Sequence, residues 1–142
     1  MIRALLASLA LLATPAIAAP RAALRPPVGQ VRLPVLSYSV NASGPAAGAL
    51  TGRRDVVMVD YTLTLLDGTV VDSSVARGEP ATFPLNQLIP AWQILVQLMR
   101  PGDDWTFYVP PEYGYGPTAR DNLPANSFLV FRVKLIAAHA PE

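Results

Sequence analysis

Cysteine is absent from the 142-residue sequence, and the single histidine, His139, lies close to the C-terminal end. Without cysteine the chain forms no disulfide and has no thiolate nucleophile. A histidine outside the folded body argues against a Ser-His-Asp triad or a histidine metal site. No glycine-rich loop joins a strand to a helix, and the adjacent carboxylates Asp103 and Asp104 are interpreted as a solvated turn. These absences favour a binding site, or a reaction without proton transfer that uses no metal and no cofactor.

Long apolar runs are also absent, apart from a short one at the N-terminus. The apolar run from Ala4 to Ala13 follows Arg3, and Ala16-Ile17-Ala18 has the small-x-small form of a cleavage site. This pattern predicts a signal peptide over residues 1–18 and a periplasmic or secreted protein. The run is too short for a membrane anchor, and Pro15 interrupts it.

Charge of one sign does not dominate the chain. Arg3 is the only charged residue in the predicted signal peptide, so the ten remaining basic residues equal the ten acidic ones. A balanced mature chain argues against nucleic acid as a partner and, after signal cleavage, against a membrane. Residues 19–34 contain prolines and no periodic pattern, which predicts a flexible tether. Residues 35–140 are predicted to form one folded domain.

Most of that domain has the patterns of strands. Residues 56–66 alternate between apolar and polar types, as in a half-buried strand, and Asp67-Gly68 is a strong hairpin signal. Shorter strands are predicted elsewhere, over residues 35–40, 69–73, 81–85, 104–109 and 128–136. Everything after residue 55 other than one helix is predicted to be strand or loop.

That helix is predicted to begin at Pro90, where a first-turn proline is tolerated, and to end before Pro101-Gly102. Its apolar residues recur at helical spacing, at Trp92, Leu95, Val96 and Met99. One short helix among many strands is what those strands wrap around, so the fold class is α+β. Trp92 is then either a plug of the core or the floor of a pocket.

The segment from Pro110 to Asn126 has no periodicity, and loops of this length within compact domains are usually functional or disordered. It holds Tyr113 and Tyr115 among glycines and prolines, a composition that disordered loops rarely have. We therefore predict a packed loop that contributes to a binding site.

Several motifs in order resemble those of a known family. They are Val59-Asp60-Tyr61-Thr62, Asp67-Gly68-Thr69-Val70-Val71-Asp72-Ser73-Ser74, Gly78-Glu79-Pro80-Ala81-Thr82-Phe83, Leu88-Ile89-Pro90-Ala91-Trp92, Tyr113-Gly114-Tyr115-Gly116, Leu123-Pro124-Ala125-Asn126 and Leu129-Val130-Phe131. In this order and spacing the chain resembles the FKBP-type peptidyl-prolyl cis-trans isomerases. It is most similar to their bacterial, macrophage infectivity potentiator-like branch, without that branch's long N-terminal dimerisation arm.

The resemblance implies a curled antiparallel β-sheet, a half-barrel, wrapped around one short α-helix with an apolar pocket between them. It implies a peptidyl-prolyl isomerase that helps exported proteins to fold, with proline-containing polypeptides as substrates and macrolides as a further ligand class. The catalytic positions it implies are Tyr61, Asp72, Ile89, Trp92, Tyr115 and Phe131. The implied substrate-binding positions are Val71, Phe83, Leu88 and Leu123.

In this resemblance the Ile89 N–H and the Tyr115 hydroxyl hold substrate carbonyls. Asp72 acts through its negative field or a hydrogen bond to Tyr61, or else only ties down the turn that follows it. Where relatives carry Phe, Gly and Gly, this chain carries Val71, Leu63 and Ala91. These departures bear on catalytic strength and weaken the expected macrolide affinity. They leave open a second class of function, a weakly active or non-catalytic binding or chaperone domain.

Overall fold

The computed structural model describes residues 34–142. The predicted signal peptide and all but the last residue of the predicted tether therefore lie outside the described residues. The described chain forms six strands, which are β1 (Ser37–Ala42), β2 (Val56–Leu65), β3 (Val70–Ser73), β4 (Ala81–Pro84), β5 (Asp104–Val109) and β6 (Leu129–His139). It also forms two short α-helices, α1 (Ser74–Arg77) and α2 (Pro90–Leu95), and the 3-10 turns η1 (Leu85–Gln87), η2 (Val96–Leu98) and η3 (Pro111–Tyr113).

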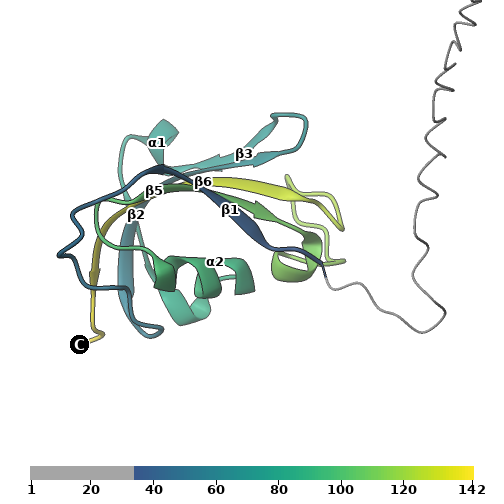
Figure 1. The fold of residues 1–142 in the computed structure, drawn as a ribbon. Coiled ribbons are helices and arrows are strands. Elements are labelled where there is room, and N and C mark those ends of the chain that lie inside the picture. The colour runs from purple at the N-terminus through teal and green to yellow at the C-terminus, as the bar shows by residue number, and fades with distance from the viewer. Residues whose placement is uncertain (1–33) are drawn as a thin grey trace, which may run out of the picture. The chain divides into compact units, whose positions relative to one another are not determined.

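All six strands belong to one antiparallel sheet in the order β1-β5-β6-β2-β3, with β4 also paired to β2. Strand β2 is the centre of this arrangement: β6 pairs along one edge, and β3 and β4 share the other edge. The sheet curls over α2, which lies against its concave face (Figure 1). The predicted α+β half-barrel around one short helix is confirmed.

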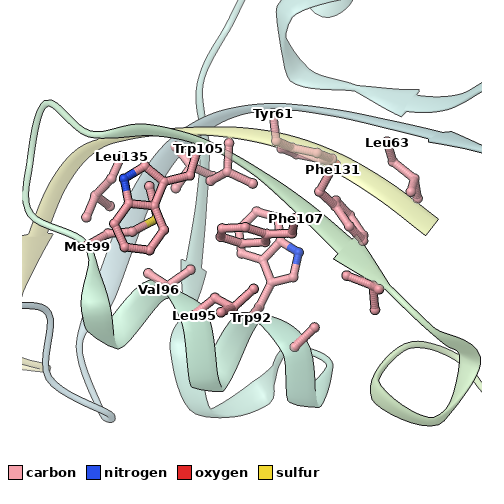
Figure 2. Close-up of a cluster of buried hydrophobic side chains, with 14 of the residues drawn as sticks. Tyr61, Leu63, Trp92, Leu95, Val96, Met99, Trp105, Phe107, Phe131 and Leu135 are labelled. Atoms are coloured by element: carbon pink, nitrogen blue, oxygen red, sulfur yellow. The ribbon is translucent and has the colours of Figure 1, made fainter. Parts of the chain in front are cut away.

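Alternation along the strands explains the core. In β2, the side chains of Val57, Val59, Tyr61 and Leu63 are buried on the inner face, whereas the residues between them are partly or fully exposed. Helix α2 and the turn after it contribute Trp92, Leu95, Val96 and Met99 to the same core. Figure 2 shows the ring of Trp92 directed from α2 towards Phe107 and Phe131, with Trp105 beside Met99 and Leu135 at the other end of the core.

The prediction of strand and loop outside one helix is wrong at residues 74–77, because these form α1. A single helical turn is too short to show apolar periodicity, and its own side chains hold it in place. The Ser73 hydroxyl caps the helix by accepting from the N–H of Ala76 at 3.1 Å. The Ser74 hydroxyl, fully buried, accepts from the N–H of Tyr61 at 2.8 Å and so ties α1 to β2.

The predicted helix from residue 90 to 99 is shorter as an α-helix than its pattern indicates. The chain is α-helical only to Leu95 and then tightens into η2, so the apolar stripe still faces the sheet. Strand β1 begins two residues later than predicted. Strand β6 extends to His139, which pairs with Val56 of β2, so the interpretation of His139 as lying outside the folded body is wrong, although its side chain is exposed.

Asp103 is buried, with 6% of its surface exposed, so its interpretation as part of a solvated turn is wrong. Its carboxylate accepts from the backbone N–H groups of Gly44 at 2.6 Å and Arg100 at 2.9 Å. Asp103 therefore connects the loop after β1 to the segment between η2 and β5. No helix among residues 34–142 combines the length and the hydropathy needed to cross a lipid bilayer.

Candidate active site

A pocket of about 230 Å³ opens between the concave face of the sheet and the N-terminal end of α2. Its lining comes from strands β2, β3, β4 and β6, from α2 and the segment that leads into it, and from the loop after η3. The lining residues are Tyr61, Leu63, Asp72, Phe83, Leu88, Ile89, Trp92, Tyr115 and Phe131. These residues are spread over most of the domain, so the pocket exists only when the sheet has closed around the helix.

Trp92 forms the floor of this pocket. Its ring meets those of Tyr61, Phe83 and Phe131 in edge-to-face geometry, with centroid separations of 5.8, 6.4 and 5.5 Å. On its other side it meets Phe107 at 6.1 Å. Only 3% of Trp92 is exposed, and that small surface faces the pocket. The two alternatives for Trp92 are therefore both realised, since it plugs the core and floors the pocket.

A polar network occupies the wall formed by β2 and β3. The Tyr61 hydroxyl donates a hydrogen bond to one oxygen of Asp72, and the guanidinium of Arg77 donates to the other. A second guanidinium nitrogen of Arg77 lies 3.4 Å from the Tyr61 hydroxyl oxygen. The capped helix α1 places Arg77 here, five residues after Asp72. Asp72 thus has a positioning partner on each oxygen and faces the pocket as an ion.

The network shifts the pKa values of both acids. Burial, followed by the hydrogen bond to Asp72, raises the pKa of Tyr61 above its ordinary value. For Asp72, burial acts upwards, but the hydrogen bond from Tyr61 and the bonds and charge of Arg77 outweigh it and lower the pKa. At neutral pH the site therefore presents a neutral phenol and an ionised carboxylate, and neither group is near its titration range.

Two hydrogen-bond donors at the pocket have no partner within residues 34–142. The backbone N–H of Ile89, at the N-cap position of α2, donates no hydrogen bond there, and neither does the Tyr115 hydroxyl. Both residues line the pocket, so both donors are available to carbonyl groups of a bound peptide. Pro90, the first residue of α2, has no backbone N–H that would need a partner. No side chain caps α2 at this end, so the end of the helix is open.

The structure brings eight of the ten predicted site residues together around the pocket: Tyr61, Asp72, Phe83, Leu88, Ile89, Trp92, Tyr115 and Phe131. Val71 and Leu123 are not among its lining residues. Leu123 is buried in the core, and Val71 is half-buried and packs against that core. Residues 63 and 64 of β2 face residues 70, 71 and 72 of β3, so Val71 is the extra residue of a β-bulge.

Two residues at the site are not among the ten predicted site residues. Leu63, which was named only as a departure from the family pattern, lines the pocket, and its position two residues after Tyr61 on the same face of β2 could have shown this. Arg77 carries no such signal, since its place depends on α1. Within the described part of the chain, no three His, Cys, Asp or Glu side chains are grouped so that they could hold a metal ion.

The comparisons with known proteins agree with this architecture. The family model described as FKBP-type peptidyl-prolyl cis-trans isomerase matches residues 49–136, and the chain belongs to this family. An FKBP-type peptidyl-prolyl cis-trans isomerase FkpA of Aeromonas hydrophila is 50% identical over 106 residues, which cover 75% of this chain and 39% of the relative.

Two further proteins place the chain in the group that contains FkpA and Mip. The outer membrane protein MIP of Legionella longbeachae is 42% identical over 103 residues, covering 72% of this chain and 43% of that protein. The crystal structure of FkpA from Escherichia coli superposes with a TM-score of 0.70 at 36% identity, covering 74% of this chain and 48% of that one. The chain thus spans less than half the length of these three proteins.

Proposed function

We propose that this protein is a peptidyl-prolyl cis-trans isomerase that accelerates rotation about Xaa-Pro bonds of polypeptides. The observation that carries the proposal is the aromatic pocket above Trp92, with two unpaired donors at its rim. The pocket is smaller than the roughly 300–1,000 Å³ of typical small-molecule sites. It therefore suits a prolyl ring with its adjacent amide better than a large ligand.

The reaction needs no nucleophile, base or metal. Rotation of an amide faces a barrier of about 18–20 kcal/mol, because the planar form is stabilised by resonance. A prolyl ring held on Trp92, with its flanking carbonyls on the Ile89 N–H and the Tyr115 hydroxyl, leaves the bond between them free to twist. The twisted amide has a less polar carbonyl than the planar one, so an apolar pocket disfavours it less. Contacts that are stronger in the twisted form lower the barrier.

Asp72 supports this chemistry through position and charge. Its carboxylate accepts from Tyr61 and Arg77, which fixes the hydroxyl of Tyr61 at the wall of the pocket. The negative charge of the carboxylate faces an amide whose nitrogen becomes more basic as resonance is lost, but the ion pair with Arg77 and the 42% exposure of the Asp72 side chain weaken that field. The hydrogen bonds from Tyr61 and Arg77 hold the carboxylate in place, so it does not have to reorganise during the reaction. In this proposal Asp72 contributes to the reaction in addition to ordering the start of α1.

We propose further that the protein works on exported polypeptides in the periplasm or outside the cell, where it assists folding. The sequence pattern of residues 1–18 supports a cleaved signal peptide, with residues 19–34 as a tether and 35–140 as the isomerase domain. Macrolides are proposed as weak ligands. Leu63 occupies pocket wall where relatives have glycine, so less space is available for a bulky ring system.

A protease-coupled assay tests the activity. The full chain is added to a series of short peptides that differ only in the residue before proline, and the rate of cis-to-trans conversion is compared with the uncatalysed rate. The matched control is Ile94→Ala, a change on the exposed side of α2 away from the pocket, which should leave the rate unchanged. An uncatalysed rate for every peptide, with peptide binding retained, would establish a non-catalytic binding or chaperone domain.

A further inference from the structure

A second hollow, of about 460 Å³, adjoins the pocket. Leu88, Ile89 and Tyr115 line both cavities, so the two share a wall. Beyond that wall the hollow is polar, and its remaining lining residues are Gln87, Gly114, Thr118 and Arg120. We call this hollow the side groove. In the binding mode proposed above, the residues that flank the proline would extend past Ile89 and Tyr115 into the side groove.

The side groove contains one charged residue, Arg120, and the fold holds it in place. Its guanidinium lies 4.5 Å from the ring centroid of Tyr115, a cation–π contact. Its backbone exchanges two hydrogen bonds with Leu123, at 2.8 and 2.9 Å, and the side chain of Leu123 is buried in the core. A third bond, from the N–H of Asn126 to the carbonyl of Gly116 at 2.9 Å, closes the loop. Arg120 is therefore presented from an anchored turn.

The charge of Arg120 is not neutralised by its surroundings. Among residues 34–142, carboxylates lie within ion-pair distance of Arg77 and Arg132 but not of Arg120. The comparison with Arg77 matters because both arginines lie beside the substrate pocket: Arg77 is paired with Asp72, whereas Arg120 offers its donors to the solvent. The other polar side chains of the side groove, those of Gln87 and Thr118, carry no charge.

We propose that Arg120 is a specificity-determining residue that favours substrates with an aspartate or glutamate within two positions of the proline. The inference rests on the isomerase activity proposed above. A guanidinium presents paired donors that match the two oxygens of a carboxylate, and its stacking on Tyr115 keeps that face oriented. Because Tyr115 also holds a substrate carbonyl in the proposed mechanism, the acidic side chain and the reacting bond are read by adjacent groups.

The test uses the full chain and a set of peptides that contain Leu-Pro. In each peptide one residue, either before Leu or after Pro and at most two positions from the pair, is Glu, Gln or Lys, and the rest of the sequence is the same. We expect kcat/KM to rank Glu over Gln over Lys at one end of the peptide only. The expected ratio of Glu to Gln is about two- to fivefold, as for a solvent-exposed ion pair. It should shrink at high salt, which screens exposed charges.

Variants separate the local contact from net charge. Arg120→Gln should bring the ratio of Glu to Gln close to one, and Arg120→Glu should reverse it. The matched control is Lys134→Gln, which removes the same charge from the outer face of β6, away from the pocket. A ratio near one in the unaltered protein overturns the proposal. An equal ratio at both ends of the peptide, or one that Lys134→Gln lowers as much as Arg120→Gln, also overturns it.

Binding of the same peptides, followed by the change in tryptophan fluorescence, distinguishes failure of the specificity role from failure of the isomerase activity. If no peptide is isomerised but Glu peptides bind better and Arg120→Gln removes that advantage, the specificity role stands and the catalytic proposal falls. If the Leu-Pro peptides are isomerised without any preference for Glu, the catalytic proposal stands and the specificity role falls. If no peptide binds, both are overturned.

Discussion

Replacement of Trp92 should damage stability and binding together, because one ring serves both. Trp92 is 3% exposed and makes aromatic contacts with four rings at centroid separations of 5.5 to 6.4 Å. Trp92→Ala should cost about 3–5 kcal/mol of unfolding free energy, the usual range for a buried aromatic cut to alanine. At about 4–8 °C per kcal/mol, the melting temperature should fall by roughly 12–40 °C.

A loss of that size approaches the lower end of the stability range of typical domains, about 5–15 kcal/mol, so a milder variant is needed as well. Trp92→Phe keeps an aromatic ring but leaves part of the floor empty, and we expect a smaller fall in melting temperature with clearly weaker peptide binding. The matched control is Phe107→Leu. Phe107 is fully buried and touches Trp92 from the side away from the pocket. Phe107→Leu should lower the stability of the protein without lowering the affinity of the folded protein for peptide.

The measurements are thermal melts and peptide titrations, the latter carried out well below the melting temperature of each variant. Two results would contradict this double role of Trp92. If Trp92→Phe melts lower but binds peptide as tightly as the unaltered protein, Trp92 belongs to the core alone. If Trp92→Phe and Phe107→Leu weaken binding equally, the effect comes from general loosening of the core rather than from the floor of the pocket.

Four other predictions concern particular residues. Turnover should be nearly flat between about pH 5.5 and 8, since the pKa of Asp72 is lowered and that of Tyr61 raised; a steep limb near about pH 6–7 would contradict this. The stabilising effect of ionised Asp72 should be complete above its unfolded pKa of about 3.9 and should be lost as the pH falls through the lower pKa of the folded state. Thermal melts of Asp72→Asn and of the unaltered protein over a series of acidic pH values would show this, because the difference between them should disappear at the lowest pH. Val71→Phe should leave peptide affinity unchanged and Leu63→Ala should alter it, because of these two residues only Leu63 lines the pocket. Peptide titrations in which Val71→Phe alters the affinity and Leu63→Ala does not would show that Val71 belongs to the site. Asp103→Asn should cost about 1–3 kcal/mol in denaturant unfolding, because an amide cannot accept from both the Gly44 and Arg100 N–H groups as the carboxylate does, whereas the exposed Asp67→Asn should cost much less.

The regular strands were predictable because their burial alternates along the chain. Strand β5 has the predicted bounds and β2 differs by a single residue, since each has one face on the core and one towards solvent. Helix α2 was predictable from its apolar stripe, although not the point at which it tightens into a 3-10 turn. That point depends on packing under the sheet rather than on local sequence.

The candidate site was predictable where a motif fixes a residue type and not where tertiary contacts decide. The eight residues that line the pocket as expected lie on regular strands, at the start of α2 or in the tyrosine-rich loop. The bulge at Val71 carries no sequence signal, because the same letters fit an unbroken hairpin strand. Arg77 reaches Asp72 only because two serine hydroxyls, those of Ser73 and Ser74, build α1. Neither feature can be read from periodicity.

The position of β6 between β5 and β2 has a consequence for synthesis of the chain. Strand β6 comes last in the sequence of strands, yet it joins the two halves of the sheet, pairing with β5 on one side and β2 on the other. While the ribosome is still making residues before Leu129, β1 and β5 can pair, and β2 can pair with β3 and β4, but each piece has an open edge. Such edges attract other strands, so the nascent chain is exposed to aggregation until its final strand is available.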